Sequence, residues 1–308
     1  MTNFSTSSFH SGFVSVMGRT NVGKSTLINT LVGQQIAAVS PRPQTTRHQQ
    51  LGILTDEQAQ IIFVDTPGLH NPYHKLGEFM NEEAAEALND TDVILFVVDI
   101  TEMPPHPEDR ILVELLDGLD EPRKVILTIN KIDRLEGGEE IARRESAYHK
   151  LLPEATPIKV SAARGDGLDE LVHLIKENLP EGPPYYPPGQ ITDLYEREIA
   201  ADLIRASCLV HLQHEVPHAV AVRIDEYTER NEHGAYIRAT IFVERESQKG
   251  IVIGKGGSMI KRIGAYARKK IEDMSGRKVF LKLRVKVRKN WRDDEQTLRQ
   301  FGFQKWKK

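Results

Sequence analysis

Short apolar runs alternate with longer segments of helical periodicity in the first 180 residues. The run 93–98 is continuous over strand length, which is typical of strands buried on both faces of a sheet. The predicted strands are 13–17, 51–54, 61–64, 93–99, 125–129 and 158–160. The predicted helices are 26–31, 74–89, one that begins at Pro107, 139–151 and 168–179. Strands that alternate with helices predict an α/β fold with a doubly wound, mostly parallel sheet.

The pattern changes beyond residue 190. Helical spacing covers 193–211, and two alternating segments, 220–224 and 235–243, flank a turn at 230–234 and predict a hairpin. A short helix is expected at 248–253 and a basic amphipathic helix at 258–274. The apolar stripe of this second helix contains Met259, Ile260, Ile263, Ala267 and Ile271. Residues 279–287 predict a closing strand, with Val279, Leu281, Leu283, Val285 and Val287 facing inward and Lys282, Arg284, Lys286 and Arg288 outward. This order, α-β-β-α-α-β, predicts a smaller α+β domain.

A proline-rich stretch separates the two patterns. Residues 179–189 contain five prolines in eleven residues, so neither a helix nor a strand can persist there. We therefore expect a first domain at 1–180, a semi-rigid linker at 181–191 and a second domain at 192–308.

Composition narrows the class of protein. The longest apolar run of the predicted strands is far shorter than the roughly 20 residues that span a bilayer. The N-terminal residues lack the basic start and apolar core of a secretory signal. With Cys208 as its one cysteine the chain cannot form an internal disulfide, which favours a reducing cytoplasm.

Charge is distributed unevenly along the chain. The formal net charge is −3, yet residues 247–292 hold fifteen Lys and Arg against only Glu272 and Asp273. This block therefore carries +13 and the rest of the chain −16. A basic block on an otherwise acidic chain indicates a polyanionic partner for that block.

Residues 18–25, GRTNVGKS, follow the first predicted strand and open the first predicted helix. They match the phosphate-loop pattern G-x-x-x-x-G-K-[ST] at every fixed position. Gly18 and Gly23 allow the backbone N–H groups to turn toward phosphate oxygens. Lys24 is expected to reach the β- and γ-phosphates, and the Ser25 hydroxyl to bind Mg²⁺.

Three further motifs follow at the carboxyl ends of predicted strands, where such sheets bind ligands. They are DTPG at 65–68, NKID at 130–133 and SAA at 161–163. Asp133 can accept from both the N1–H and the 2-amino group of guanine, a donor pair that adenine lacks. Binding adenine would leave that carboxylate unpaired, so this position favours guanine.

Together with QTTR at 44–47, these motifs resemble the five boxes of small GTP-binding proteins. The resemblance implies that Asp65 holds Mg²⁺ through water, that the Gly68 N–H meets the γ-phosphate, and that Thr46 rather than Thr45 completes the metal shell. The implied catalytic residues are Lys24, Thr46, Asp65 and Gly68, and the implied magnesium ligands are Ser25, Thr46 and Asp65. The implied GTP-binding residues are Gly18, Arg19, Thr20, Asn21, Val22, Gly23, Lys24, Ser25, Thr26, Asp65, Thr66, Pro67, Gly68, Asn130, Lys131, Asp133, Ser161, Ala162 and Ala163.

One position departs from the Ras-like pattern. Leu69 stands where those proteins have the glutamine that orients the attacking water, so hydrolysis needs another water-positioning group or is slow. Some related GTPases share this apolar replacement and recruit K⁺ through a phosphate-loop asparagine. Asn21 stands at that position and is either a K⁺ ligand or a loop-capping residue.

The second domain resembles a type II KH domain. The segment VIGKGG at 252–257, between two predicted helices, matches the GXXG loop of such domains. Such loops clamp about four nucleotides of single-stranded nucleic acid. The implied RNA-binding residues are Ile253, Gly254, Lys255, Gly256, Gly257, Lys261, Arg262, Lys269, Lys286 and Arg288. Alternatively, the basic face is a solvated surface or contacts anionic lipid.

A GTPase domain, a proline-rich linker and a KH domain together resemble the Era-type GTPase family over nearly the whole chain. The resemblance implies a monomeric cytoplasmic GTP/GDP switch with Mg²⁺. It also implies binding to the 3′ end of 16S ribosomal RNA on the 30S subunit, peripheral contact with the inner membrane, and no DNA partner. Two alternatives stay open: a membrane-associated signalling GTPase, and an RNA chaperone whose GTPase is vestigial.

Overall fold

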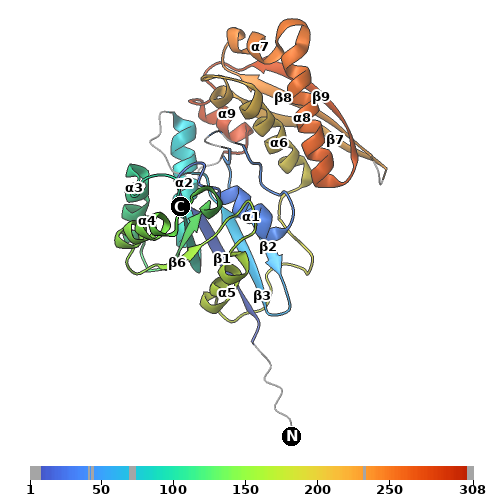
Figure 1. The fold of residues 1–308 in the computed structure, drawn as a ribbon. Helices are drawn as coiled ribbons and strands as arrows, with labels where there is room; N and C mark the ends of the chain where they lie inside the picture. The colour runs from blue at the N-terminus through green and yellow to red at the C-terminus, as the bar shows by residue number, and fades with distance from the viewer. Residues whose placement is uncertain (1–7, 41, 43–44, 69–73, 232–233, 304–308) are drawn as a thin grey trace. The chain divides into compact units, whose positions relative to one another are not determined.

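The computed structural model describes residues 8–40, 42, 45–68, 74–231 and 234–303 (Figure 1). The chain divides into two compact units. The first contains residues 1–34, 49–70 and 82–193, and the second contains residues 35–48, 71–81 and 194–308. Two segments of the N-terminal half therefore cluster with the C-terminal half. Below, "first unit" and "second unit" refer to these two sets.

The first unit is built on a six-stranded sheet in the order β2-β3-β1-β4-β5-β6. Its strands are β1 (His10–Met17), β2 (Gln50–Thr55), β3 (Ala59–Asp65), β4 (Val93–Asp99), β5 (Lys124–Asn130) and β6 (Thr156–Lys159). All neighbouring pairs are parallel except β2 and β3. The doubly wound, mostly parallel sheet is thus confirmed.

Helices cover both faces of this sheet (Figure 1). They are α1 (Lys24–Val32), α3 (Pro107–Asp117), η1 (Ile132–Arg134), α4 (Gly138–Leu151) and α5 (Leu168–Asn178), and α2 (Lys75–Asn89) begins in the second unit and continues into the first. Leu88 of α2, Leu112 of α3 and Tyr148 of α4 pack into one core against β4 and β5. Every residue of β3 and of β4 is buried, as continuous apolar runs predict.

The second unit has a three-stranded sheet in the order β7-β8-β9, with β7 antiparallel and β9 parallel to β8. Its elements are α6 (Glu196–His211), η2 (Pro217–Ala219), β7 (Ala221–Asn231), β8 (Gly234–Val243), α7 (Glu246–Ile253), η3 (Lys255–Gly257), α8 (Ser258–Ser275), β9 (Lys278–Val287) and α9 (Glu295–Gln300). The order α-β-β-α-α-β is confirmed, and α9 is an addition that the sequence pattern did not predict.

One face of the β7-β8-β9 sheet packs against α6 and α8. Ile237 of β8 is buried with Leu203 of α6 and Ile263 of α8 in one apolar core, which also holds Cys208. The predicted alternation of β9 is confirmed, because Val279, Leu281, Leu283, Val285 and Val287 are buried or half-buried, whereas the basic residues and Phe280 are exposed. Ile260 is the exception in the predicted stripe of α8, since it lines a surface groove instead of the core.

A second apolar cluster of this unit lies around Trp291, which is fully buried. Its indole N–H donates to the Ala219 carbonyl at 2.8 Å, and its ring meets that of Phe301 edge-on at 5.4 Å. Leu76 and Phe79 of α2 belong to the same cluster. The C-terminal tail is thus part of the core of the second unit.

Within the ranges that the structure describes, we find no helix that combines the length and the apolar character needed to cross a membrane.

Candidate functional site

The loop between β1 and α1 has a conformation that depends on its glycines. Gly18 and Gly23 have φ angles of 149° and 105°. A β-carbon on Gly18 would lie 2.4 Å from the Val97 carbonyl oxygen, and one on Gly23 would lie 2.4 Å from the amide nitrogen of Asn130. Only glycine fits at either position, so the backbone forms a cradle at the N-terminus of α1. Such a cradle fits a phosphate chain.

Lys24 belongs to this cradle. It is buried, and its ammonium group donates to the carbonyl oxygens of Gly18 at 2.8 Å and Arg19 at 3.1 Å. Burial lowers the pKa of Lys24 to about 8, against the opposing effect of Asp65. A cation held inside the loop with little hydration is suited to bind phosphate oxygens.

Ser25 and Asp65 converge next to Lys24. The Ser25 hydroxyl, at the start of α1, donates to the Asp65 carboxylate at 2.7 Å, and Asp65 is fully buried at the end of β3. A hydroxyl and a carboxylate at this distance form an oxygen donor set of the kind that Mg²⁺ prefers. The residues present therefore fit the expected metal.

Gly68 follows Asp65 and approaches the phosphate loop closely. A β-carbon on Gly68 would lie 2.8 Å from the Thr20 methyl group and 3.2 Å from the Thr20 backbone nitrogen. Between them, Thr66 donates its hydroxyl to the Val16 carbonyl at 2.9 Å and so fixes this segment to β1. Leu69 lies outside the described residues.

Asn130 connects three of the predicted motifs. Its amide group donates to the Val22 carbonyl at 2.8 Å, and its amide oxygen accepts from the Ala162 N–H at 3.0 Å and the Lys131 N–H at 2.8 Å. The phosphate loop, the NKID segment and the SAA segment are thus joined through one side chain.

Asp133 lies beside these loops and is partly exposed. One of its carboxylate oxygens accepts from the Ser161 hydroxyl at 2.7 Å. Ser161 is itself held by its N–H, which donates to the Asp166 carbonyl at 2.9 Å. The carboxylate is oriented from a rigid loop, as selective binding to a purine edge requires.

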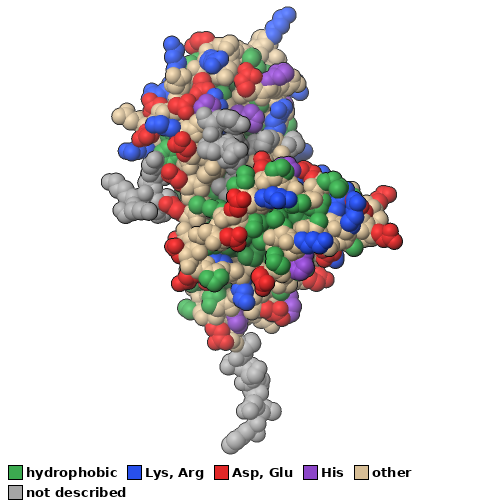
Figure 2. Space-filling view, turned by 90° about the vertical axis from the view of Figure 1, so that its left-hand side faces the viewer, with side chains coloured by type: hydrophobic (Ala, Val, Ile, Leu, Met, Phe, Trp, Pro, Cys, Tyr) green, Lys and Arg blue, Asp and Glu red, His purple; other side chains and the backbone are tan. Residues whose placement is uncertain are grey.

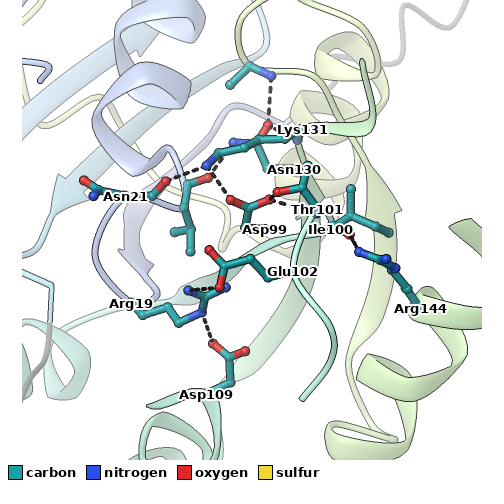
Figure 3. A network of polar contacts seen from close by, with 12 residues as sticks. Arg19, Asn21, Asp99, Ile100, Thr101, Glu102, Asp109, Asn130, Lys131 and Arg144 are labelled. Carbon is teal, nitrogen blue, oxygen red and sulfur yellow. Dashed lines mark hydrogen bonds and ion pairs between the residues drawn. The ribbon is translucent and has the colours of Figure 1, made fainter. Parts of the chain in front are cut away.

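Lys131 has a partner that our sequence reasoning missed (Figure 3). Its ammonium group donates to the Asn21 carbonyl at 2.7 Å and to the Asp99 carboxylate at the end of β4. The other carboxylate oxygen of Asp99 accepts from the N–H and the hydroxyl of Thr101. Hydrogen bonds from Lys131 and Thr101 hold the pKa of Asp99 below its usual value, against the opposing effect of burial. The sequence did hold a signal for this contact, because Asp99 is a charged residue directly after the continuous apolar run 93–98.

Arg19 makes a second connection that the sequence did not indicate (Figure 3). Its side chain is buried and pairs with Asp109 of α3 at 3.2 Å and with Glu102 at 3.0 Å. Asp109 is fully buried, while Glu102 is half-exposed. Arg19 therefore fixes the phosphate loop to α3.

The segment 35–48 belongs to the second unit, and with it Thr45 and Thr46. The buried guanidinium of Arg47 donates to the carbonyls of Val220 at 2.8 Å and His218 at 2.9 Å, and lies 5.7 Å from the ring centre of Trp291. Nearby, the Leu76 N–H donates to the Arg292 carbonyl at 3.0 Å. The magnesium assignment of Thr46 stays a prediction.

The glycine loop of the second unit joins α7 to α8. Gly254, Gly256 and Gly257 have φ angles of 73°, 60° and 78°, and a β-carbon on Gly256 would meet no atom within 4 Å. The loop is therefore open on its outer side, and Lys255 is exposed there. Such a backbone lets a sugar–phosphate chain approach closely.

A groove of about 370 Å³ runs between α8 and β9. It is lined by Ile260, Lys261, Gly264, Ala265, Arg268, Leu281, Lys282 and Leu283. Of the predicted RNA-binding residues, Lys261 lines it directly. Lys286 and Arg288 lie on the opposite face of the sheet, where Arg288 donates to the Thr297 hydroxyl. The apolar floor and Arg268 were not predicted.

On the face of the molecule drawn in Figure 2, acidic and basic side chains are interspersed among apolar ones.

Both halves of the chain match known protein families. A family model described as "50S ribosome-binding GTPase" matches residues 13–131, and one described as "KH domain" matches residues 215–292. The GTPase Era of Carboxydothermus hydrogenoformans is 47% identical over 96% of this chain and 98% of its own length. That of Geobacter metallireducens is 45% identical over the same shares. The chain belongs to the GTPase Era family.

Solved structures of Era have the same fold. An Era complex with MgGDPNP and nucleotides 1506–1542 of 16S ribosomal RNA matches with a TM-score of 0.89 and 40% identity, over 96% of this chain and 99% of that one. A variant of Aquifex aeolicus Era bound to GDP·AlF4⁻ matches with the same values. The predicted family, the P-loop GTPase fold and the KH domain are confirmed, and the enzymatic activity of the Era family is GTP hydrolysis.

Proposed function

We propose that this chain is a GTP-driven switch that binds the 3′ end region of 16S ribosomal RNA and assists assembly of the 30S subunit. One observation carries the proposal. The chain combines a phosphate cradle and a carboxylate placed for guanine in one half with an open glycine loop beside a groove rimmed by cations in the other. The same chain is 47% identical to a GTPase Era over 96% of its length.

In the GTPase half, each motif has a separate task. Lys24 binds the β- and γ-phosphates, Asp133 reads guanine, and the Gly68 N–H meets the γ-phosphate. Ser25 and, through water, Asp65 hold Mg²⁺, which neutralises charge on the phosphates. Thr46 completes this shell when segment 35–48 engages the nucleotide.

Water positioning needs a group other than residue 69, because a leucine cannot hydrogen-bond to water. We propose K⁺ at Asn21 as a contributor. Asn21 has a φ of 64°, and its carbonyl is held by Lys131, so its side chain is presented from a fixed backbone. The exposure of Asn21 at the loop surface supports this role.

In the KH half, the groove between α8 and β9 accommodates bases while the glycine loop meets the backbone. Ile260, Leu281 and Leu283 supply an apolar floor, and Lys261 and Arg268 supply cations at its rim. A groove with this composition suits single-stranded RNA better than a duplex, whose bases are stacked and paired.

Nucleotide state would act on RNA through segments 35–48 and 71–81. Arg47 already ties the first of these to η2 and to Val220, directly before β7, and Leu76 ties the second to Arg292. Rearrangement around the γ-phosphate would break or make these bonds. Coupling is reciprocal, so RNA should tighten binding of one nucleotide by the same factor.

We infer that the protein works in the cytoplasm, where its proposed RNA partner is assembled into the 30S subunit. We also infer that it acts as a monomer and has no DNA partner. The groove and glycine loop favour a nucleic acid strand over anionic lipid as the partner of the basic surface, and peripheral contact with the inner membrane is the alternative proposal.

The test is binding of the 1506–1542 RNA segment to the full chain loaded with GDP or GDPNP at fixed salt. Gly256→Asp should abolish RNA binding, since a carboxylate would face the phosphate path. Gly276→Asp is the matched control, because Gly276 has a φ of 67° and equal free space at the other end of α8. Equal RNA loss in both variants would refute the glycine-loop site, and equal affinities of the wild type in both nucleotide states would refute the switch.

A further inference from the structure

The second unit carries an aromatic pair, an exposed Phe280 and a half-buried Tyr236, on the sheet face opposite to its helices. Tyr236 of β8 and Phe280 of β9 are register partners in the parallel pair. Their neighbours Ile237 and Val279 are buried in the core beneath α6 and α8, so by the alternation of a strand the two rings project from the other face. This face is separate from the groove between α8 and β9.

The two rings are stacked and form a small apolar surface. The ring planes are 13° from parallel with centroids 5.7 Å apart, and Phe280 is 64% exposed. A phenylalanine this exposed beside a second aromatic ring contributes nothing to the core, so its position calls for another explanation. Farther along the same face, Phe242 is covered by Phe301 at 5.0 Å. The open aromatic surface is thus confined to the start of β9.

Cations surround this surface unevenly. Lys278 and Lys282 project beside Phe280 on the same face, and the Lys278 side chain is 89% exposed with its nearest acid, Glu272, 3.8 Å away. Over the described part of the chain, no acid lies within ion-pair distance of Lys282. On the side of the sheet nearer β7, the basic side chains are instead paired with acids. Arg238 pairs with Glu226 at 3.0 Å, and Arg284 pairs with Asp225 at 3.0 Å. The positive excess therefore lies along β9.

The aromatic surface and the groove lie on either side of the same sheet edge. β9 is the edge strand of the sheet, and its residues Leu281, Lys282 and Leu283 line the groove. Phe280 precedes them and follows the C-terminal end of α8, so it lies at the end of the groove remote from Gly254–Gly257. A strand that leaves the groove there has to pass only the edge of β9 to reach the two rings.

We propose that Tyr236 and Phe280 form a stacking platform for an unpaired base of an RNA strand that extends beyond the groove. Lys278 and Lys282 neutralise the phosphates that pass the strand edge. Bases of any identity stack on aromatic rings, so the platform adds affinity and length preference without reading sequence. This inference rests on the proposed RNA-binding function and assigns it a second contact area.

The experiment compares RNA length in the full chain. Fluorescence anisotropy at fixed salt measures binding of a groove-length oligonucleotide of about four nucleotides and of oligonucleotides extended by four at the 5′ or the 3′ end. One extension should raise wild-type affinity. Phe280→Ala should reduce that gain by about five- to a hundred-fold and leave the short oligonucleotide unaffected.

Matched variants separate stacking from other causes. Phe280→Trp should restore the gain, whereas Phe280→Leu, which keeps apolar bulk without a ring, should not. Tyr266→Ala removes an exposed aromatic ring that packs on His211 instead, and should change nothing. Lys278→Ala should lower the salt dependence of the extended oligonucleotide by about one phosphate contact. Thermal unfolding of each variant checks that the fold is retained.

The outcomes are distinct. If Phe280→Ala leaves the gain intact, or if Phe280→Leu restores it, the platform is refuted while RNA binding in the groove stands. If the wild type binds no oligonucleotide, the proposed RNA function itself fails. If Phe280→Ala reduces cosedimentation with phosphatidylglycerol vesicles but not RNA binding, the rings contact lipid and the platform is equally refuted.

Discussion

Lys131 and Asp99 form a partly buried ion pair that ties the NKID segment to the end of β4, while the same ammonium group holds the Asn21 carbonyl of the phosphate loop. Three segments of the nucleotide site thus share one cation. Its position depends on Asp99, because Thr101 fixes the other carboxylate oxygen.

Asp99→Asn should weaken GDP binding by about ten- to a hundred-fold. The amide would present N–H groups to the Lys131 ammonium, and a hydrogen bond to a charged group contributes about 1.5–3 kcal/mol. Stopped-flow release of a fluorescent GDP analogue measures the effect. Glu102→Gln is the control, because its carboxylate is half-exposed and such pairs contribute little. Equal release rates in wild type and Asp99→Asn would show that Lys131 is positioned without Asp99.

Asp133→Asn should transfer preference from guanine to xanthine nucleotides. The substitution replaces an acceptor with a donor opposite the N1–H and 2-amino positions, which should cost GTP affinity about ten- to over a hundred-fold. Asp166→Asn is the control and should keep the preference for guanine. The Asp166 side chain is exposed, and only the backbone carbonyl of this residue accepts from the Ser161 N–H. Competition titrations with GTP and XTP decide the matter, and unchanged GTP affinity would place guanine recognition elsewhere.

Asn21→Gly should abolish any difference between K⁺ and Na⁺ in the rate of GTP hydrolysis. Glycine tolerates the φ of 64° at this position, so the loop keeps its shape and only the side chain is lost. Wild-type turnover should be faster in K⁺ at equal ionic strength. Equal wild-type rates in the two salts would refute the cation proposal and leave the GTPase assignment intact.

Deprotonation of Glu83 should lower the free energy of unfolding as the pH rises from about 4.5 to about 7. Burial raises the pKa of this carboxyl to about 7 in the folded chain, from 4.5, while its bond from the Gln49 N–H opposes the shift. The folded state therefore holds a proton that the unfolded state has released, and that stabilisation is complete below pH 4.5 and lost through pH 7. We expect about 1–2 kcal/mol after allowing for partial exposure.

Glu83→Gln tests this, because glutamine stays neutral and can still accept from Gln49. Urea unfolding at pH 5 and pH 8 should show a smaller stability difference in this variant than in the wild type. Glu57→Gln, an exposed change of equal charge, should keep the wild-type difference. The same pH slope in all three proteins would contradict the prediction.

The sequence predicted the strands and phosphate loop well because their causes are local. A continuous apolar run such as 93–98 can only be a buried strand at that length, and Gly18 and Gly23 are required by backbone geometry at those positions. Alternation along β9 likewise depends on one strand and one core.

Pairings between distant segments were not predictable in this way. Asp99 and Lys131, or Arg19 and Asp109, are joined by the strand order of the sheet, and no periodicity reports on that order. The apolar side chain of Ile260 fits a core stripe and a groove wall equally well, so spacing alone could not distinguish them. The grouping of 35–48 with the C-terminal half has no signature in composition at all.

The buried indole of Trp291 gives the molecule an intrinsic optical reporter. The chain has two tryptophans, and the other, at position 306, lies outside the described residues. With Trp306→Phe, fluorescence would come from an indole whose surroundings include the Arg47 guanidinium at 5.7 Å. Displacement of segment 35–48 would change the electric field at that ring and therefore its emission. Movement of this segment during nucleotide turnover could thus be followed in real time without attaching a dye.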